Sequence, residues 1–124
     1  MTQTNQNSEQ VLRHKLDLLL RTGQLLLESA ADTNRVMRNM KRTAAFLGLP
    51  EEHLHIYVTY NMLMVNLSDA EHSFSKFQRC DKHGINMTTI SLVSKLSWKA
   101  IREDYSIERY EEELEKIMNR PRNY

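Results

Sequence analysis

The sequence contains little cysteine, glycine, proline or tryptophan. Its 124 residues include one Cys, three Gly, two Pro and one Trp. With Cys80 alone, no disulfide can form within the chain, and this composition suits a reducing compartment. The length allows one domain with one modest core rather than two.

Long apolar runs and an excess of one charge are also absent. No apolar stretch approaches the roughly 20 residues of a membrane-spanning helix. The polar N-terminus, MTQTNQNSEQ, does not resemble a secretory signal. The 17 Lys and Arg residues nearly balance 16 Asp and Glu residues, so net charge gives no case for nucleic-acid binding. We expect a soluble, cytosolic chain with no nucleic-acid partner.

The first quarter of the chain predicts a helix with a close neighbour. After a disordered lead-in over residues 1–8, apolar residues at helical spacing indicate a helix over Glu9–Leu27. Gly23 lies on its apolar stripe, although glycine costs about 1 kcal/mol against alanine in a helix interior. Another element is therefore expected to pack closely at Gly23.

Three further helices are predicted from their start and stop signals. Ser29 and Asp32 form a capping-box-like start for a second helix, which Gly48 ends. A third helix is capped by Asn86 or Thr88 and runs to about Arg102, and a fourth is capped by Ser106 and ended by Pro121.

Between these helices the pattern changes to alternation, which is typical of strands. The predicted strands are Leu54–Tyr60, Met62–Leu67 and a weaker one over Glu71–Gln78. Phe74 and Phe77 have opposite parity in the last, which indicates a bulge or an edge position. The prediction is an α+β fold of order ααβββαα over residues 9–120, with a small antiparallel three-stranded sheet packed against helices.

Histidines and the cysteine offer two candidate metal sites. His53 and His55 are predicted on one strand face, where His72 of the third strand could join them. Cys80 and His83 have Cys-x-x-His spacing, which could form half a zinc site or a thiolate–imidazole pair. A small metal-dependent hydrolase is therefore one alternative, but ordinary polar histidines and a small buried thiol in a surface turn are the preferred interpretation. No metal and no cofactor are expected.

Charged stretches have a plainer interpretation. The acidic run Glu111–Glu113, with Glu115, lies opposite the apolar stripe of the last helix and is expected to be solvated. Arg35, Arg38, Lys41 and Arg42 make the second helix basic, which favours solubility and leaves binding of an anion or acidic partner open. A phosphate loop, a nucleophile elbow and a His-Glu-x-x-His helix are absent from the sequence. Exposed Met62 and Met64 would suit a homo-oligomeric interaction module, which is a further alternative.

Three segments, taken together, resemble the soluble N-terminal domain of the threonine/serine exporter family, which includes split relatives implicated in dicarboxylate export. Leu25–Leu49 resembles the family's helix, small-residue turn and acid-Thr-x-Arg-Val helix, with Ala30-Ala31 where the family commonly has Gly-Ala. His55–Leu67 resembles its paired strands, and His83–Met87 its Arg-Gly-Ile-Asp/Asn segment, with His83 in place of the arginine. The resemblance covers about residues 11–120.

The resemblance implies a non-enzymatic domain on the cytoplasmic side of the bacterial inner membrane. It would act in gating, assembly or substrate sensing, with the membrane-embedded region of the same or a partner subunit as its partner and a small amino acid or dicarboxylate such as succinate as a possible ligand. Residues 121–124 resemble the lead into a membrane region that is not in this sequence. The ligand-binding candidates carried over are Asp32, Arg35, Thr59, Arg79 and His83.

Overall fold

The structure is a computed structural model that describes residues 2–68 and 73–120. The chain forms four helices, one short 3-10 helix and three strands, which confirms the predicted α+β order. These elements are α1 (Thr2–Glu28), α2 (Thr33–Phe46), η1 (Glu51–His53), β1 (Leu54–Val58), β2 (Met62–Ser68), β3 (Ser73–Arg79), α3 (Met87–Arg102) and α4 (Ile107–Met118).

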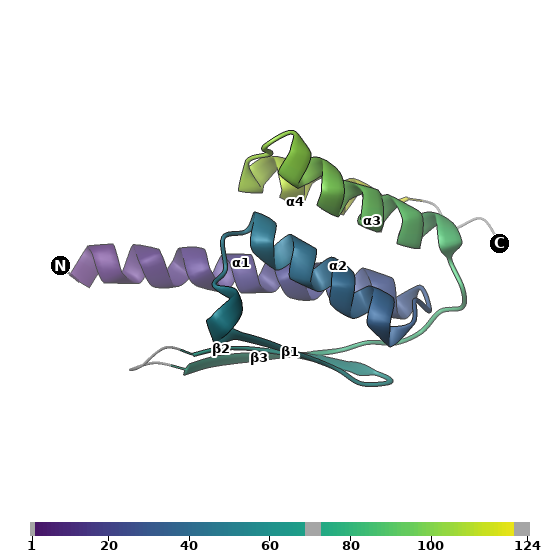
Figure 1. Cartoon of the computed structure of the whole chain (residues 1–124), viewed down its shortest axis with the longest axis horizontal. Coiled ribbons are helices and arrows are strands. Elements are labelled where there is room, and N and C mark those ends of the chain that lie inside the picture. Colours follow the sequence, from purple (N-terminus) through teal and green to yellow (C-terminus); the bar gives the residue numbers. More distant parts are fainter. Residues whose placement is uncertain (1, 69–72, 121–124) are drawn as a thin grey trace.

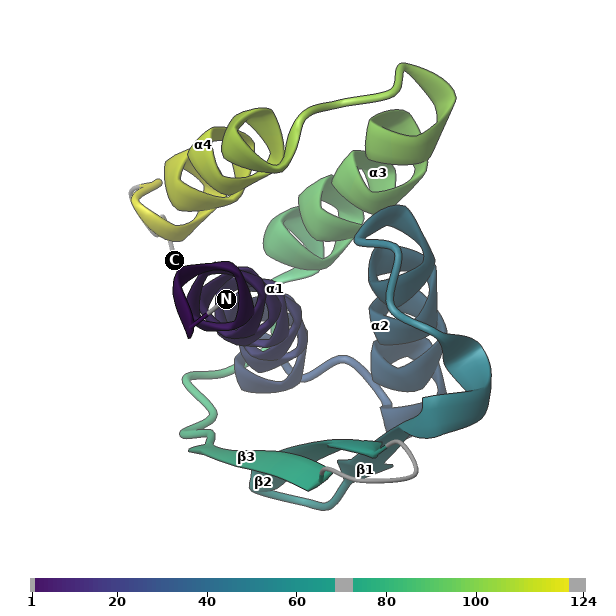
Figure 2. The same ribbon diagram turned by 90° about the vertical axis from the view of Figure 1, so that its left-hand side faces the viewer.

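The elements are stacked in three layers (Figures 1 and 2). The antiparallel sheet, in the order β1-β2-β3, forms one outer layer, α1 and α2 cover one of its faces, and α3 and α4 lie on the far side of those helices. None of the helices in the described residues lies on the other face of the sheet. The sheet is therefore covered on one side only, as its alternating sequence predicts.

The core lies between the sheet and the helices. Leu63 and Val65 of β2 are fully buried, as are Leu19 and Leu26 of α1. Gly23 is the point of closest approach, because a Cβ atom there would lie 2.5 Å from Met40 Sδ and 2.8 Å from Leu63 Cδ1. This confirms the close packing predicted at Gly23.

Three helices end in the same type of turn. After α2, Leu49 N donates to Ala44 O while Gly48 takes a positive φ of 74°. This six-to-one bond, with a left-handed residue before it, is the Schellman motif. Ala30 (φ 67°) after α1 and Asp104 (φ 51°) after α3 occupy the same position in equivalent turns. The left-handed conformation is therefore adopted twice by a residue that has a Cβ atom.

Several predicted boundaries are wrong. α1 begins at Thr2 rather than Glu9, since nothing between them breaks a helix, so the predicted disordered lead-in is helical from Thr2 onward. The capping box at Ser29 is also wrong, because Ser29 still donates to Leu25 O at the end of α1 and Asp32 is the N-cap of α2. The caps Asn86 and Ser106 are confirmed.

The predicted strands need smaller corrections. β1 ends at Val58, and Tyr60 lies in the turn to β2. β3 is an edge strand paired to β2 in continuous register from Ser73 to Arg79, so the edge alternative is confirmed and no bulge occurs within that pairing. The predicted residues 71 and 72 of this strand, and the predicted lead into a membrane at 121–124, lie outside the described residues.

Candidate functional site

A groove lies between α2 and the edge strand β1. Its volume is about 380 Å³, which lies within the range of small-molecule pockets. Its apolar lining comes from α2, from the turn that follows and from β1, and consists of Met37, Ala44, Ala45, Leu49, Leu54 and Ile56. The groove therefore presents a mainly apolar wall to a ligand about the size of an amino acid.

Four residues with polar side chains also contribute to the lining of this groove. They are Lys41, Glu51, His55 and Tyr57. Lys41 and Glu51 are exposed, and within residues 2–68 and 73–120 neither makes a side-chain hydrogen bond or ion pair. An uncommitted ammonium and an uncommitted carboxylate in one groove can pair with a carboxylate and an ammonium of a ligand. His55 and Tyr57 line the groove at the edge of β1, but their side chains alternate with the inward-facing Leu54 and Ile56 and so lie on the other face of the sheet.

Local structure explains how these groups reach the groove. Lys41 and Ala45 lie on the flank of α2 beside the buried stripe that includes Met40 and Ala44. Glu51 follows Pro50 and opens η1, whose Glu51 O accepts a hydrogen bond from Leu54 N. This short helix brings the chain from α2 back to the sheet. The groove is thus assembled from one helix flank, one turn and one strand.

The five residues predicted to bind ligand lie on three segments at one end of the molecule. The linker from β3 to α3 packs on the end of α1, since His83 N donates to Glu28 O and Asn86 N donates to Ser29 O. The same linker reaches the turn between β1 and β2, where Cys80 N donates to Asn61 O. The turn into α2, the β1–β2 turn and the β3–α3 linker therefore share this end (Figure 1).

Three of these five residues make side-chain contacts that are local. Asp32 Oδ1 accepts the cap bond from Arg35 N at 2.8 Å, and Thr59 Oγ1 donates to Met62 O at 3.2 Å. Arg79 Nε lies 3.9 Å from Asp81 Oδ1, with both side chains mostly exposed. In the described part of the chain, no side-chain hydrogen bond or ion pair joins one predicted residue to another across the three segments. Ligand binding by this set stays a prediction.

One of the two candidate metal sites consists of Cys80 and His83. Cys80 is buried, and burial raises the pKa of its thiol to about 11, with Glu28 and Asp81 adding to the shift. Such a thiol holds its proton at neutral pH, whereas nucleophiles and metal ligands need the thiolate. His83 is exposed. The small buried thiol of the preferred interpretation is what the structure shows.

The predicted histidine face is wrong in one respect. His53 lies in η1 and not on a strand, because β1 begins at Leu54. The register places Asn66 and Ser75 across from His55, and His72 lies outside the described residues. Among residues 2–68 and 73–120, no group of three or more His, Cys, Asp or Glu side chains could hold a metal ion.

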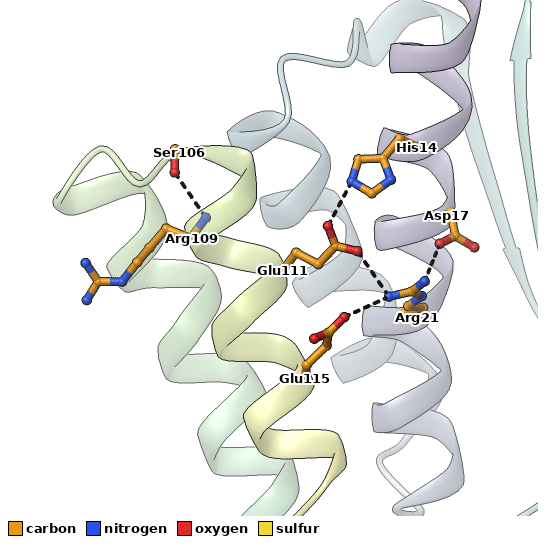
Figure 3. Close-up of polar contacts among 7 residues, drawn as sticks. All are labelled: His14, Asp17, Arg21, Ser106, Arg109, Glu111 and Glu115. Carbon is orange, nitrogen blue, oxygen red and sulfur yellow. Dashed lines mark hydrogen bonds and ion pairs between the residues drawn. The ribbon is translucent and has the colours of Figure 1, made fainter.

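The acidic run on α4 is partly a contact surface rather than a wholly solvated one. Glu111 is half-buried, with Oε1 3.0 Å from His14 Nε2 and Oε2 3.4 Å from Arg21 Nη1 of α1 (Figure 3). Arg21 also pairs with Asp17 at 3.0 Å and reaches Glu115 at 4.0 Å. Glu112 and Glu115 remain exposed, as predicted. This cluster joins α1 to α4, with Arg21 shared among Asp17, Glu111 and Glu115.

The sequence alone does not predict this groove. In the sequence Lys41 is one of several cations of the second helix, and no local pattern links it to Glu51. His55 and Tyr57 alternate with the inward-facing Leu54 and Ile56, a pattern that indicates a strand with one inward and one exposed face. That α2 lies along β1 is a tertiary fact that periodicity does not contain.

The fold and groove define a small α+β domain with a pocket on one edge of its sheet. A comparison with protein families identifies the family to which the chain belongs. The profile of the ThrE family, described as a threonine/serine exporter family, matches residues 17–124. The chain belongs to this family. No curated protein and no solved structure matches it. Among the described helices, none is both long enough and apolar enough to span a bilayer.

Proposed function

We propose that this chain is the soluble, non-enzymatic domain of a bacterial inner-membrane exporter of small polar metabolites and that it lies on the cytoplasmic side. Membership of the ThrE family over residues 17–124 is the observation that carries this proposal. The domain acts with the membrane-embedded region of the same or a partner subunit, in gating, assembly or substrate sensing. Among these roles, the groove between α2 and β1 favours sensing.

The chemistry of the groove matches a hydroxy amino acid better than a dicarboxylate. A threonine or serine zwitterion carries one carboxylate, one ammonium and one hydroxyl. Lys41 suits the first and Glu51 the second. Succinate would satisfy Lys41 but would place its second carboxylate in the same small groove as Glu51, which disfavours it.

Calorimetry with threonine, serine and succinate tests the sensing role. Wild-type protein is expected to bind threonine or serine, and Lys41→Met to abolish that heat by removing the carboxylate partner. Glu51→Gln is expected to weaken threonine and to strengthen succinate, because only threonine needs the anion. Lys99→Met and Glu52→Gln are matched controls, since both side chains are exposed and neither lines the groove. Heat that is lost with Arg79→Gln or His83→Gln, and kept with Lys41→Met, would move the site to the predicted residues.

The uncovered face of the sheet favours a second candidate function, an oligomeric interaction module. Tyr57, Met64 and Phe77 lie side by side across the three strands, and Tyr57 and Phe77 are more than half exposed. Met62, predicted as a contact, is also exposed on this face. Light scattering at high concentration tests this candidate. A dimer that Phe77→Ser dissociates would support it, and a monomer throughout would count against it.

A further inference from the structure

Two adjacent helices carry positive charge without any acidic residue. α2 and α3 lie side by side on one flank of the molecule, and neither contains Asp or Glu (Figure 2). Cations recur at helical spacing on both: Arg35, Arg38 and Arg42 on α2, and Lys95, Lys99 and Arg102 on α3. Each set forms one stripe along its helix. We call these six residues, together with Trp98, the basic face.

Within the described residues, no cation of the basic face has an ion-pair partner. In the described residues, every ion pair lies elsewhere, either on α1 and α4 or between Arg79 and Asp81. The nearest carboxylates along the chain are those of Asp32 and Glu103, at the start of α2 and the end of α3. Although the net charge of the chain is only +1, its positive charges are concentrated on this surface, apart from the acidic residues.

Trp98, an exposed aromatic residue of this face, packs on Arg42, which is itself hydrogen-bonded to buried residues. The Arg42 guanidinium lies 3.8 Å from the centroid of the Trp98 ring. Its Nη1 donates to Asn39 Oδ1 and to Ser97 Oγ, both at 3.0 Å. Asn39 and Ser97 are buried, whereas Trp98 is 58% exposed. The ring is therefore presented to solvent on a fixed support.

We propose that the basic face binds the anionic headgroups of a phospholipid bilayer. Two stripes of separated cations, each about 10 Å long over seven helical rises, match a repeating charged surface better than one small anion. An exposed Trp beside Arg and Lys is the composition typical of a membrane interface. The exposed side chain of Ile101 adds apolar area on α3.

A second copy of the chain fits this face less well. The most acidic element is α4, but Glu111 is paired with His14 and Arg21, and Glu113 with Arg109 and Lys116. Those carboxylates are already engaged within their own chain. The inference also uses a different surface from the groove and stands whether or not the groove binds a metabolite.

Tryptophan fluorescence gives a direct readout because Trp98 is the only tryptophan. Vesicles of phosphatidylcholine containing about one third phosphatidylglycerol are expected to shift the emission to shorter wavelength. Pure phosphatidylcholine vesicles should leave it unchanged. Raising the salt to about 0.5 M should reverse the shift, since the Debye length then falls to a few ångströms. No shift with the anionic vesicles, or an equal shift with both compositions, overturns the proposal.

A matched pair of variants separates this face from overall charge. Lys95→Gln/Lys99→Gln and Arg13→Gln/Lys116→Gln each remove two exposed cations, the first pair from the basic face and the second from α1 and α4. At about 1 kcal/mol for each cation near an anionic surface, the first is expected to weaken vesicle binding about 10- to 30-fold. The second should bind as the wild type does. Equal losses, or a shift with RNA and none with vesicles, would overturn the proposal, and circular dichroism checks that both variants fold.

Discussion

The hydroxyl of Tyr110 lies 2.7 Å from Thr22 Oγ1 in the middle of the helical layers. Tyr110 is fully buried, and Thr43 Oγ1 lies 3.4 Å from the same hydroxyl. Three helices, α1, α2 and α4, therefore meet at one buried hydroxyl. Thr22 also donates to Leu18 O at 2.9 Å, so that Tyr110 donates to Thr22 in turn. This small network fixes α4 over the two helices that cover the sheet.

Tyr110→Phe is expected to lower the free energy of unfolding by about 1 kcal/mol. The change keeps the ring and its contact with Phe46 but removes the buried hydrogen bonds of the hydroxyl. Urea unfolding measures the loss. The double variant Tyr110→Phe/Thr22→Val should cost less than the sum of the single variants, because both singles break the same bond. Strict additivity would show that the two hydroxyls do not interact.

Stability is expected to fall between pH 9 and pH 11 because of Cys80. Burial favours the neutral thiol, so the pKa in the folded protein is about 11 against 9.0 for an unperturbed thiol. The contribution of Cys80 is fully present below pH 9 and is lost as the pH rises to 11, because the unfolded state gives up its proton first. The free energy of unfolding of Cys80→Ala, measured with urea at several pH values, should decline less over this interval than that of the wild type. Parallel curves for the two proteins would contradict the assignment.

Gly23→Ala is expected to destabilise the protein by about 1 to 3 kcal/mol, despite the better helix propensity of alanine. The new methyl group would lie within 3 Å of Met40 Sδ and Leu63 Cδ1, and both side chains are fully buried. Thermal unfolding checks this. Met40→Ala, combined with Gly23→Ala, should cost less than the two single changes added together. A Gly23→Ala protein that is more stable than the wild type would show that α1 and α2 pack more loosely here.

Ala30→Gly is expected to stabilise the protein by about 0.5 to 1 kcal/mol. Ala30 has a φ of 67°, where a Cβ atom costs roughly 1 to 2 kcal/mol, and glycine gives part of this back as entropy of the unfolded chain. Gly48 has a φ of 74° in the equivalent turn after α2, so Gly48→Ala should change stability in the opposite direction. Chemical denaturation of both variants tests the pair. Changes of the same sign would contradict the shared turn geometry.

Most of the fold could be predicted from the sequence because its signals are local. Asn86 and Ser106 each accept a hydrogen bond from the backbone three residues on, as cap residues do. Gly48 ends α2 because glycine readily adopts the left-handed conformation of the turn. The predicted cap at Ser29 is wrong although both Ser29 and Asp32 are suitable cap residues. The Schellman turn at Ala30 keeps Ser29 at the end of α1, so that Asp32 becomes the N-cap of α2.

The candidate site could not be predicted in the same way. Lys41 and Glu51 are ten residues apart, and their shared groove exists only because η1 folds β1 back along α2. The basic face shows the same limit, because Arg42 and Trp98 meet across two helices that are separated by the whole sheet in sequence. Local patterns identify elements, whereas these sites depend on which flanks of the elements meet.

Efflux from living cells tests the exporter role most directly. Cells of the source organism are loaded with labelled threonine, serine or succinate, and export is followed with and without the gene that encodes this chain. The account predicts slower efflux of at least one of the three after disruption, restored by the wild-type gene and not by Lys41→Met. Unchanged efflux of all three would contradict it.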